Sequence, residues 1–277
     1  MQLCLSNLNI VCCPELTCIP LCLKVEVLYL RDFNKRLKIL RTKREEKIGE
    51  VPPSSSVFSC DKLSQSLIDL ENSSKSSTVP FPTLRKVEID NVVWLNSLPM
   101  VAFQSLESLS FQDVRCELES FEEVEEVFRN CSSSLQTLEI RCCDKLRSVS
   151  GGLEHLTSLK WLEISNCPNV RLSEETEDAR PWRSLHSLHS LKFWGLPQLV
   201  SLPDWMQSLA ALKYLYVENC KRLESIPNWM PKLTSLNQLE FSGCSESLKS
   251  RCQRDPPRED WPYIKHIPII KFRNDDL

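Results

Sequence analysis

The chain has 277 residues, of which 42% are hydrophobic and 26% are charged, and its formal net charge is -3. This length and composition suit one large folded domain or one extended repeat array. The small net charge provides no broad basic field for nucleic acid or an anionic membrane, and only 5 glycines argue against a glycine-rich nucleotide-binding fold.

The 14 cysteines do not indicate a disulfide scaffold. Secreted scaffolds of that kind are usually short and cysteine-dense, whereas this chain is long. Its apolar first segment lacks the positive region of a signal peptide, and Pro14, Glu15 and Pro20 interrupt it, so we expect neither a leader nor a membrane span there. Reduced and mostly buried thiols in a cytoplasmic protein are the expectation.

One pattern, Leu-x-x-Leu-x-Ile-x-x-Cys, recurs from the first residues to the last quarter of the chain. Its copies are LSNLNIVCC, VEVLYLRDF, LRKVEIDNV, LESLSFQDV, LQTLEIRCC, LKWLEISNC, LHSLKFWGL, LKYLYVENC and LNQLEFSGC, which begin at residues 5, 25, 84, 106, 135, 159, 188, 212 and 236. Apart from one gap of 59 residues, the spacings lie between 20 and 29 residues. That is the period of a leucine-rich repeat.

The pattern predicts an α/β leucine-rich-repeat solenoid. The Leu-x-Ile part of each unit forms a short strand with alternating faces, and successive coils bury each other's apolar side. We expect a parallel concave sheet with short helical or irregular convex segments. The whole chain, 1–277, is predicted to be a single domain of about nine repeats.

Residues 34–80 interrupt the first part of this array. They contain the charge-rich LKILRTKREEKIGE and two serine-rich stretches, which indicate an exposed or disordered insertion or loop. A degenerate coil near 63–70 remains an alternative. The basic run 38–47 could touch nucleic acid or an acidic protein, but a solvated loop is the interpretation that we favour.

The convex segments have patterns of their own. In 116–131, Phe121, Val124, Val127 and Phe128 recur at helical spacing, which predicts an amphipathic helix. The acidic stretch 174–182 is predicted to be a surface loop that lengthens one coil. The related segments LVSLPDWMQSLAAL and LESIPNWMPKLTSL predict an extended start, a turn at proline and a short helical turn. Their tryptophans, Trp205 and Trp229, are expected to be buried.

No catalytic or metal-binding signature is present. Five cysteines share one position of the repeat, where leucine-rich repeats carry Asn or Cys: Cys13, Cys143, Cys167, Cys220 and Cys244. Metal binding would call for a Cys-x-x-Cys pair with partners, and none occurs. His186 and His189 are expected on the surface, and no nucleophile motif accompanies them. We expect neither enzymatic activity nor a cofactor or metal.

The outward positions of the later strands are the candidate binding surface. Adjacent strands lie about 5 Å apart, so four aromatic side chains could form one exposed strip flanked by charges, typical of protein contacts. The alternative is that the rings lie flat over neighbouring stems and are only structural. The predicted protein-binding residues are Trp161, Glu163, Lys192, Trp194, Tyr214, Tyr216, Glu218 and Glu240.

The repeat has the forms LNIVCCPEL and LEISNCPNV, and the chain carries Leu-x-Ser-Leu/Ile-Pro-x-Trp-Met segments. Its ending contains Leu248, Arg251, Cys252, Asp260, Trp261, Pro262, His266, Ile267 and Pro268 in a distinctive order. In these features nearly the whole chain resembles the C-terminal leucine-rich-repeat region of plant coiled-coil nucleotide-binding disease resistance proteins. The chain departs from that pattern only at Arg258 and Glu259, near which the family often has glycine.

This resemblance implies a recognition and autoinhibition module of an intracellular immune receptor. Its implied partners are a pathogen effector or a guarded host protein, and the nucleotide-binding domain of the same receptor. The chain has neither a G-x-x-x-x-G-K-[ST] phosphate loop nor a Met-His-Asp triplet, so we expect that it binds no nucleotide itself. Because the first unit begins at Leu5 without a cap, we expect the tail of a longer protein, closed by a cap and tail at 245–277.

Two other classes of binding protein remain alternatives. A leucine-rich-repeat substrate-receptor scaffold of a ubiquitin ligase would have an F-box-like helical segment, which we do not find. An extracellular receptor ectodomain would favour a signal peptide, a Leu-x-Gly-x-Ile-Pro repeat and cysteine-pair caps, none of which is present. An enzyme is the least supported class.

Overall fold

The structure of the chain is a computed structural model. It describes residues 6–13, 18–20, 25–33, 38–40, 83–93, 95, 98–112, 117–149, 151–172 and 180–273.

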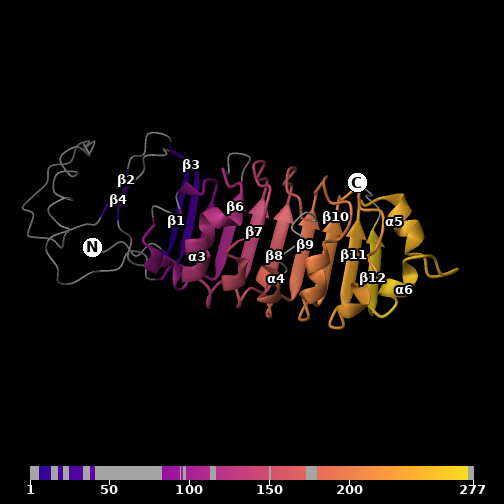
Figure 1. Cartoon of the computed structure of the whole chain (residues 1–277). Helices are drawn as coiled ribbons and strands as arrows, with labels where there is room; N and C mark the ends of the chain where they lie inside the picture. The colour runs from indigo at the N-terminus through magenta and orange to yellow at the C-terminus, as the bar shows by residue number, and fades with distance from the viewer. Residues whose placement is uncertain are drawn as a thin grey trace, which may run out of the picture.

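Ten of the described strands form one long parallel sheet, which crosses the molecule from the N-terminal to the C-terminal side (Figure 1). Its order is β1-β3-β5-β6-β7-β8-β9-β10-β11-β12. The strands are β1 Asn7–Cys13, β3 Val27–Phe33, β5 Lys86–Ile89, β6 Ser108–Gln112, β7 Thr137–Arg141, β8 Trp161–Ser165, β9 Ser190–Trp194, β10 Tyr214–Glu218, β11 Gln238–Ser242 and β12 Ile269–Arg273. This arrangement confirms the leucine-rich-repeat solenoid.

Nine of these strands come from the nine predicted units, and each starts two residues after the first position of its unit. The tenth, β12, comes from the segment 245–277, in which the sequence patterns had indicated no strand. It pairs with β11 in the same register as the repeats, with Leu239 opposite Ile270 and Phe241 opposite Phe272. The C-terminal segment therefore continues the sheet.

The solenoid interior is a stack of equivalent apolar side chains. The second strand position carries Leu138, Leu162, Leu191, Leu215 and Leu239 in successive coils, all with 0% exposure. The fourth position carries Ile, Phe or Val, also buried. Neighbouring coils bury each other in this way, which explains why the repeat period specifies the fold.

A tight turn ends each strand, and five consecutive coils use a left-handed residue there. These residues are Cys142, Asn166, Gly195, Asn219 and Gly243, with φ angles of 55°, 50°, 60°, 53° and 57°. The turn directs the N–H of Asn166 to the Trp194 carbonyl and the N–H of Asn219 to the Ser242 carbonyl, both at 2.8 Å. Asn and Gly suit this position because they tolerate positive φ.

The cysteines of the repeat follow these turns as free thiols. Cys143, Cys167 and Cys220 are buried and Cys244 is half-buried, which confirms mostly buried free thiols among the described cysteines. Each thiol donates to the carbonyl two residues earlier, and Cys244 Sγ also reaches the Val217 carbonyl of the preceding coil at 3.4 Å. Burial raises the pKa of Cys220 to about 12, so this thiol stays protonated at neutral pH. The side chain of Cys13 lies outside the described residues.

Short helices line the convex side. The predicted amphipathic helix is confirmed as a 3-10 turn, η2 (Phe121–Val124), that leads into α3 (Glu125–Asn130). Its four apolar side chains are fully buried, and the rings of Phe121 and Phe128 meet edge to face at 5.5 Å. The other 3-10 helices are η1 Met100–Phe103, η3 Leu153–His155, η4 Asp204–Ser208 and η5 Met230–Lys232.

The convex tryptophans tie neighbouring coils together. Trp205 and Trp229 are only 4% and 6% exposed, as predicted. Trp205 Nε1 donates to the Leu172 carbonyl at 3.2 Å, and Trp229 Nε1 donates to Asp204 Oδ1 at 2.7 Å. Each ring thus packs inside while its N–H bonds to the preceding coil.

Trp182 corrects the prediction of an acidic surface loop over 174–182. The end of that stretch forms α4 (Arg180–Arg183), and Trp182 is 1% exposed. Its ring stacks on Trp205 with centroids 3.4 Å apart and planes 6° apart. Trp182 therefore packs as an interior residue against the next coil. Residues 174–179 lie outside the described part.

The C-terminal segment is attached by an ion pair between the buried Asp260 and the partly exposed Arg251. It contains α5 (Glu246–Arg251) and α6 (Trp261–Ile264). Asp260, 1% exposed, accepts two hydrogen bonds from Arg251, at 2.8 and 3.0 Å, and one from the Ile226 backbone N–H at 2.8 Å. The Arg-Cys and Asp-Trp-Pro parts of the ending therefore meet each other and the last-but-one coil.

Little of the insertion 34–80 is described. Its strand β4 (Lys38–Leu40) pairs in parallel with β2 (Cys18–Pro20) in a separate two-stranded sheet, and the rest lies outside the described residues. Within the described part, no helix is long and apolar enough to span a membrane.

Candidate protein-binding surface

Alternate residues of β8 to β11 point away from the interior. We call the side chains at the first, third and fifth positions of these four strands the open face. In the strand register, its first row runs Trp161, Ser190, Tyr214 and Gln238; its third row runs Glu163, Lys192, Tyr216 and Glu240; and its fifth row runs Ser165, Trp194, Glu218 and Ser242. All eight predicted binding residues belong to these rows.

The eight residues differ in how accessible they are. Trp194 is 37% exposed, whereas Trp161, Lys192, Tyr214, Tyr216 and Glu218 are half-buried. Glu163 and Glu240 are only 6% and 5% exposed, because long side chains on neighbouring strands cover them. These two carboxylates therefore serve mainly to hold other side chains of the face.

Arg141 on β7 neutralises two carboxylates at once. Its Nη2 lies 3.0 Å from Glu163 Oε2 and 3.2 Å from Glu139 Oε1. Arg141 is not among the predicted binding residues, although it occupies the fifth position of the strand before β8 and faces the same side. The alternation of strand faces in the unit that begins at Leu135 would have placed Arg141 in the predicted binding surface.

The remaining carboxylates of the open face are paired as well. Lys192 Nζ lies 3.1 Å from Glu218 Oε2. Glu240 receives Arg273 Nε at 2.8 Å and Lys271 Nζ at 3.9 Å, both from β12. Because its charges are internally compensated, the open face offers little net field to a charged partner.

The aromatic side chains form one pair and two separate rings. Trp161 and Tyr216 lie 6.2 Å apart, with an interplanar angle of 39°, above the strand between them. The described ring contacts include neither Trp194 nor Tyr214, which corrects the expectation of one continuous strip. Trp194 is at the fifth strand position and Tyr214 at the first, so about 13 Å of strand separates the two rows.

The centre of the face is polar and half-buried. Burial, followed by the charges of Glu240 and Glu218, raises the pKa of Tyr216, so its hydroxyl stays neutral and can donate or accept. Trp161 Nε1, Arg141 Nε and Ser165 Oγ have no hydrogen-bond partner among the described residues.

One group of metal-capable side chains lies elsewhere, on the convex side. Glu125, Glu154 and His155 offer ligand atoms within 4.8 Å of one another. Glu125 Oε1 is already bonded by Arg129 Nη2 at 2.6 Å and lies 3.3 Å from His155 Nε2. Hydrogen bonds from His155 and Arg129 lower the pKa of Glu125, and the contact with His155 joins α3 to η3.

Comparison with known proteins gives one family match and several structural likenesses. The family model described as plant disease resistance protein RPS2-like, leucine-rich repeats, matches residues 105–245. No curated protein sequence matches the chain.

Three solved structures illustrate the structural likeness. The leucine-rich-repeat domain of the type III effector XopL is 20% identical, with a TM-score of 0.46 over 81% of this chain and 86% of its own. The TLR13–ssRNA13 complex has 17% identity, a TM-score of 0.46 and 82% coverage, but the match spans only 28% of that receptor chain. A leucine-rich-repeat protein of Leptospira interrogans has 13% identity and a TM-score of 0.24, over 89% of this chain and 90% of its own.

Proposed function

Because the chain belongs to the plant disease resistance protein RPS2-like leucine-rich-repeat family, we propose that it is the ligand-recognition and autoinhibitory module of an intracellular plant immune receptor. It acts in the defence response by protein–protein binding, without catalysis, and in the cytoplasm. Its proposed partners are a pathogen effector or a guarded host protein, and the nucleotide-binding domain of the same receptor, of the coiled-coil class.

The observation that carries this proposal is the open face. Four large rings, two of them paired, stand on a rigid sheet whose inward side is fully buried. Half-exposed Trp and Tyr side chains are common anchors of protein interfaces because they bury much area at low entropic cost. The paired charges around them fix the ring positions and disfavour partners with unmatched charges.

Substitution of two rings tests the proposal directly. We expect Trp194→Ala with Tyr216→Ala to leave folding intact and to weaken binding to the receptor's nucleotide-binding domain by about tenfold or more. Binding would be measured by isothermal titration with the separately purified domain. The matched control is Val101→Ala with Val200→Ala, two valines that are 40% and 45% exposed on the convex side. Unchanged binding in the open-face variant would contradict the proposal.

The transcript upstream of the coding sequence provides an independent test. A continuous reading frame that encodes a nucleotide-binding domain is the expected result. A frame encoding an F-box would instead favour the ubiquitin-ligase scaffold and overturn the receptor assignment.

A further inference from the structure

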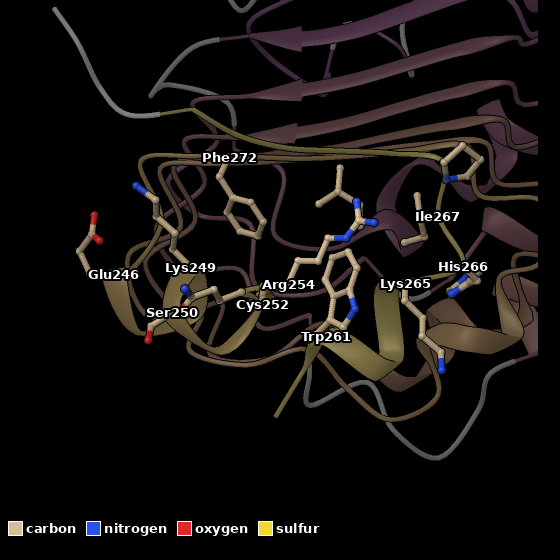
Figure 2. A pocket seen from close by; sticks show the side chains of 13 residues that line it. Glu246, Lys249, Ser250, Cys252, Arg254, Trp261, Lys265, His266, Ile267 and Phe272 are labelled. Atoms are coloured by element: carbon tan, nitrogen blue, oxygen red, sulfur yellow. The ribbon is translucent and has the colours of Figure 1, made fainter. Parts of the chain in front are cut away.

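The C-terminal end of the solenoid has a hollow of about 910 Å³ between β12, α5 and α6 (Figure 2). Ile267, Ile270 and Phe272 line its apolar part. Figure 2 shows Phe272, Arg254 and Trp261 around its centre, with α5 and α6 below the strand. This hollow lies at the end of the sheet and is separate from the open face.

The hollow exists because the stack of inward side chains stops at β12. In the preceding coils, the inward residue at the fourth strand position packs between its equivalents on both sides. Phe272 stacks on Phe241 at 5.3 Å and 22°, and no described coil covers its other side. Phe272 and Ile270 are therefore half-buried, whereas Phe241 is 1% exposed. An apolar side chain placed here would continue the stack.

The same strand also offers its backbone. Among the described strands, β12 pairs with β11 alone, and the Ile269 N–H donates to the Asn237 carbonyl on that side at 3.0 Å. No strand within the described residues pairs with the other edge of β12, so its backbone groups can pair with an added strand. This edge favours a polypeptide over a small anion, which could use the charges but not the strand edge.

The rim of the hollow is positively charged. Lys249, Arg254 and Lys265 line it, with Glu246 as the acidic residue. Arg254 lies over the Trp261 ring at 5.9 Å, and no carboxylate in the described part of the chain pairs with Arg254 or Lys265. The open face differs, since each of its carboxylates has a basic partner. The end of the solenoid therefore complements an acidic ligand.

We propose that β12 and this end hollow bind an extended, acidic segment of another protein as an added strand. The segment places an apolar side chain against Phe272 and its carboxylates beside Arg254 and Lys265. Phe272, Arg254 and Lys265 all line the hollow, and successive side chains of a strand point to opposite faces. The apolar and acidic residues of the segment therefore lie on one face of the added strand, at every second position. The surface is a second interaction site beyond the recognition role proposed for the open face.

Short synthetic peptides test this inference with the full chain. The probe peptides carry Val or Phe together with Glu at every second position, with Ser or Thr between them, and the comparison peptides carry Lys in place of Glu. We expect the acidic set alone to bind, more weakly at high salt. Arg254→Glu with Lys265→Glu should weaken binding by about tenfold. Exposed Arg183 and Lys213 provide a matched charge reversal far from the hollow, for which we expect less than about a twofold change.

Hydrogen exchange distinguishes strand addition from a charge contact. Added peptide should slow exchange of the backbone amides along β12, and Trp194→Ala with Tyr216→Ala should leave peptide binding unchanged. The inference is overturned if no acidic peptide binds, if acidic and basic peptides bind equally, or if β12 gains no protection. Self-association through this end, lost in the charge-reversal variant, would assign the surface to a second copy and would also overturn it.

Discussion

The two sides of the same strands, from β8 to β11, differ sharply in what their residues do. Inward side chains such as Leu162 and Leu215 have no exposed surface and stack on equivalents in both neighbouring coils. Outward side chains are half-buried rings and paired charges, such as Lys192 with Glu218. The repeat period therefore constrains the residues on the inward side for stability and places no such constraint on the outward side.

The largest expected effect concerns the buried convex packing. Trp182→Ala removes a fully buried ring from its stack on Trp205, and we expect a loss of about 3–5 kcal/mol in the free energy of unfolding. Urea denaturation followed by circular dichroism measures it. Trp194→Ala on the open face is the control, for which we expect a loss below about 1 kcal/mol. Equal losses of unfolding free energy in the two variants would contradict the expectation that the buried convex packing stabilises the fold more than the open face does.

An intermediate effect is expected at Asp260, a buried carboxylate whose partner Arg251 is partly exposed. Asp260→Ala leaves the Ile226 N–H without its acceptor and Arg251 without its counter-charge, so we expect a loss of about 2–3 kcal/mol. The control is Glu218→Ala, which breaks a half-buried pair with Lys192 and should cost less than about 1 kcal/mol. Thermal unfolding of both variants compares them, and a larger loss for Glu218→Ala would contradict this ranking.

The smallest effect concerns the buried thiols and depends on pH. Burial raises the pKa values of Cys131, Cys220 and Cys252 to about 12 in the folded chain, above their ordinary value of 9.0. Their stabilising contribution is therefore complete below pH 9 and is lost as pH rises toward 12. Cys220→Ala should lower the free energy of unfolding by about 1 kcal/mol at pH 7. It should also make the free energy of unfolding fall less between pH 9 and 10.5. Urea denaturation midpoints at pH 7, 9 and 10.5 test this. A fall in stability between pH 9 and 10.5 as large as that of the unsubstituted chain would contradict it.

The candidate site was predicted in part. The alternation of each strand identifies which residues face outward, and the register of the units places Trp161 two strands from Tyr216. Sequence alone could not tell that Glu163 and Glu240 are covered, or that Arg141 bridges two carboxylates. Those outcomes depend on the direction that each long side chain takes across strands more than twenty residues apart in the chain.

The sequence by itself determined the solenoid, its nine repeat strands and the burial of Trp205 and Trp229, because a periodic apolar pattern has one way to bury itself. Only the tertiary structure decided that Trp182 packs against the next coil, that β12 extends the sheet, and that Arg251 meets Asp260. These features lie outside the repeat, so no period encodes them. They depend on which surfaces of the stacked coils remain uncovered and on which charged side chains still need a partner.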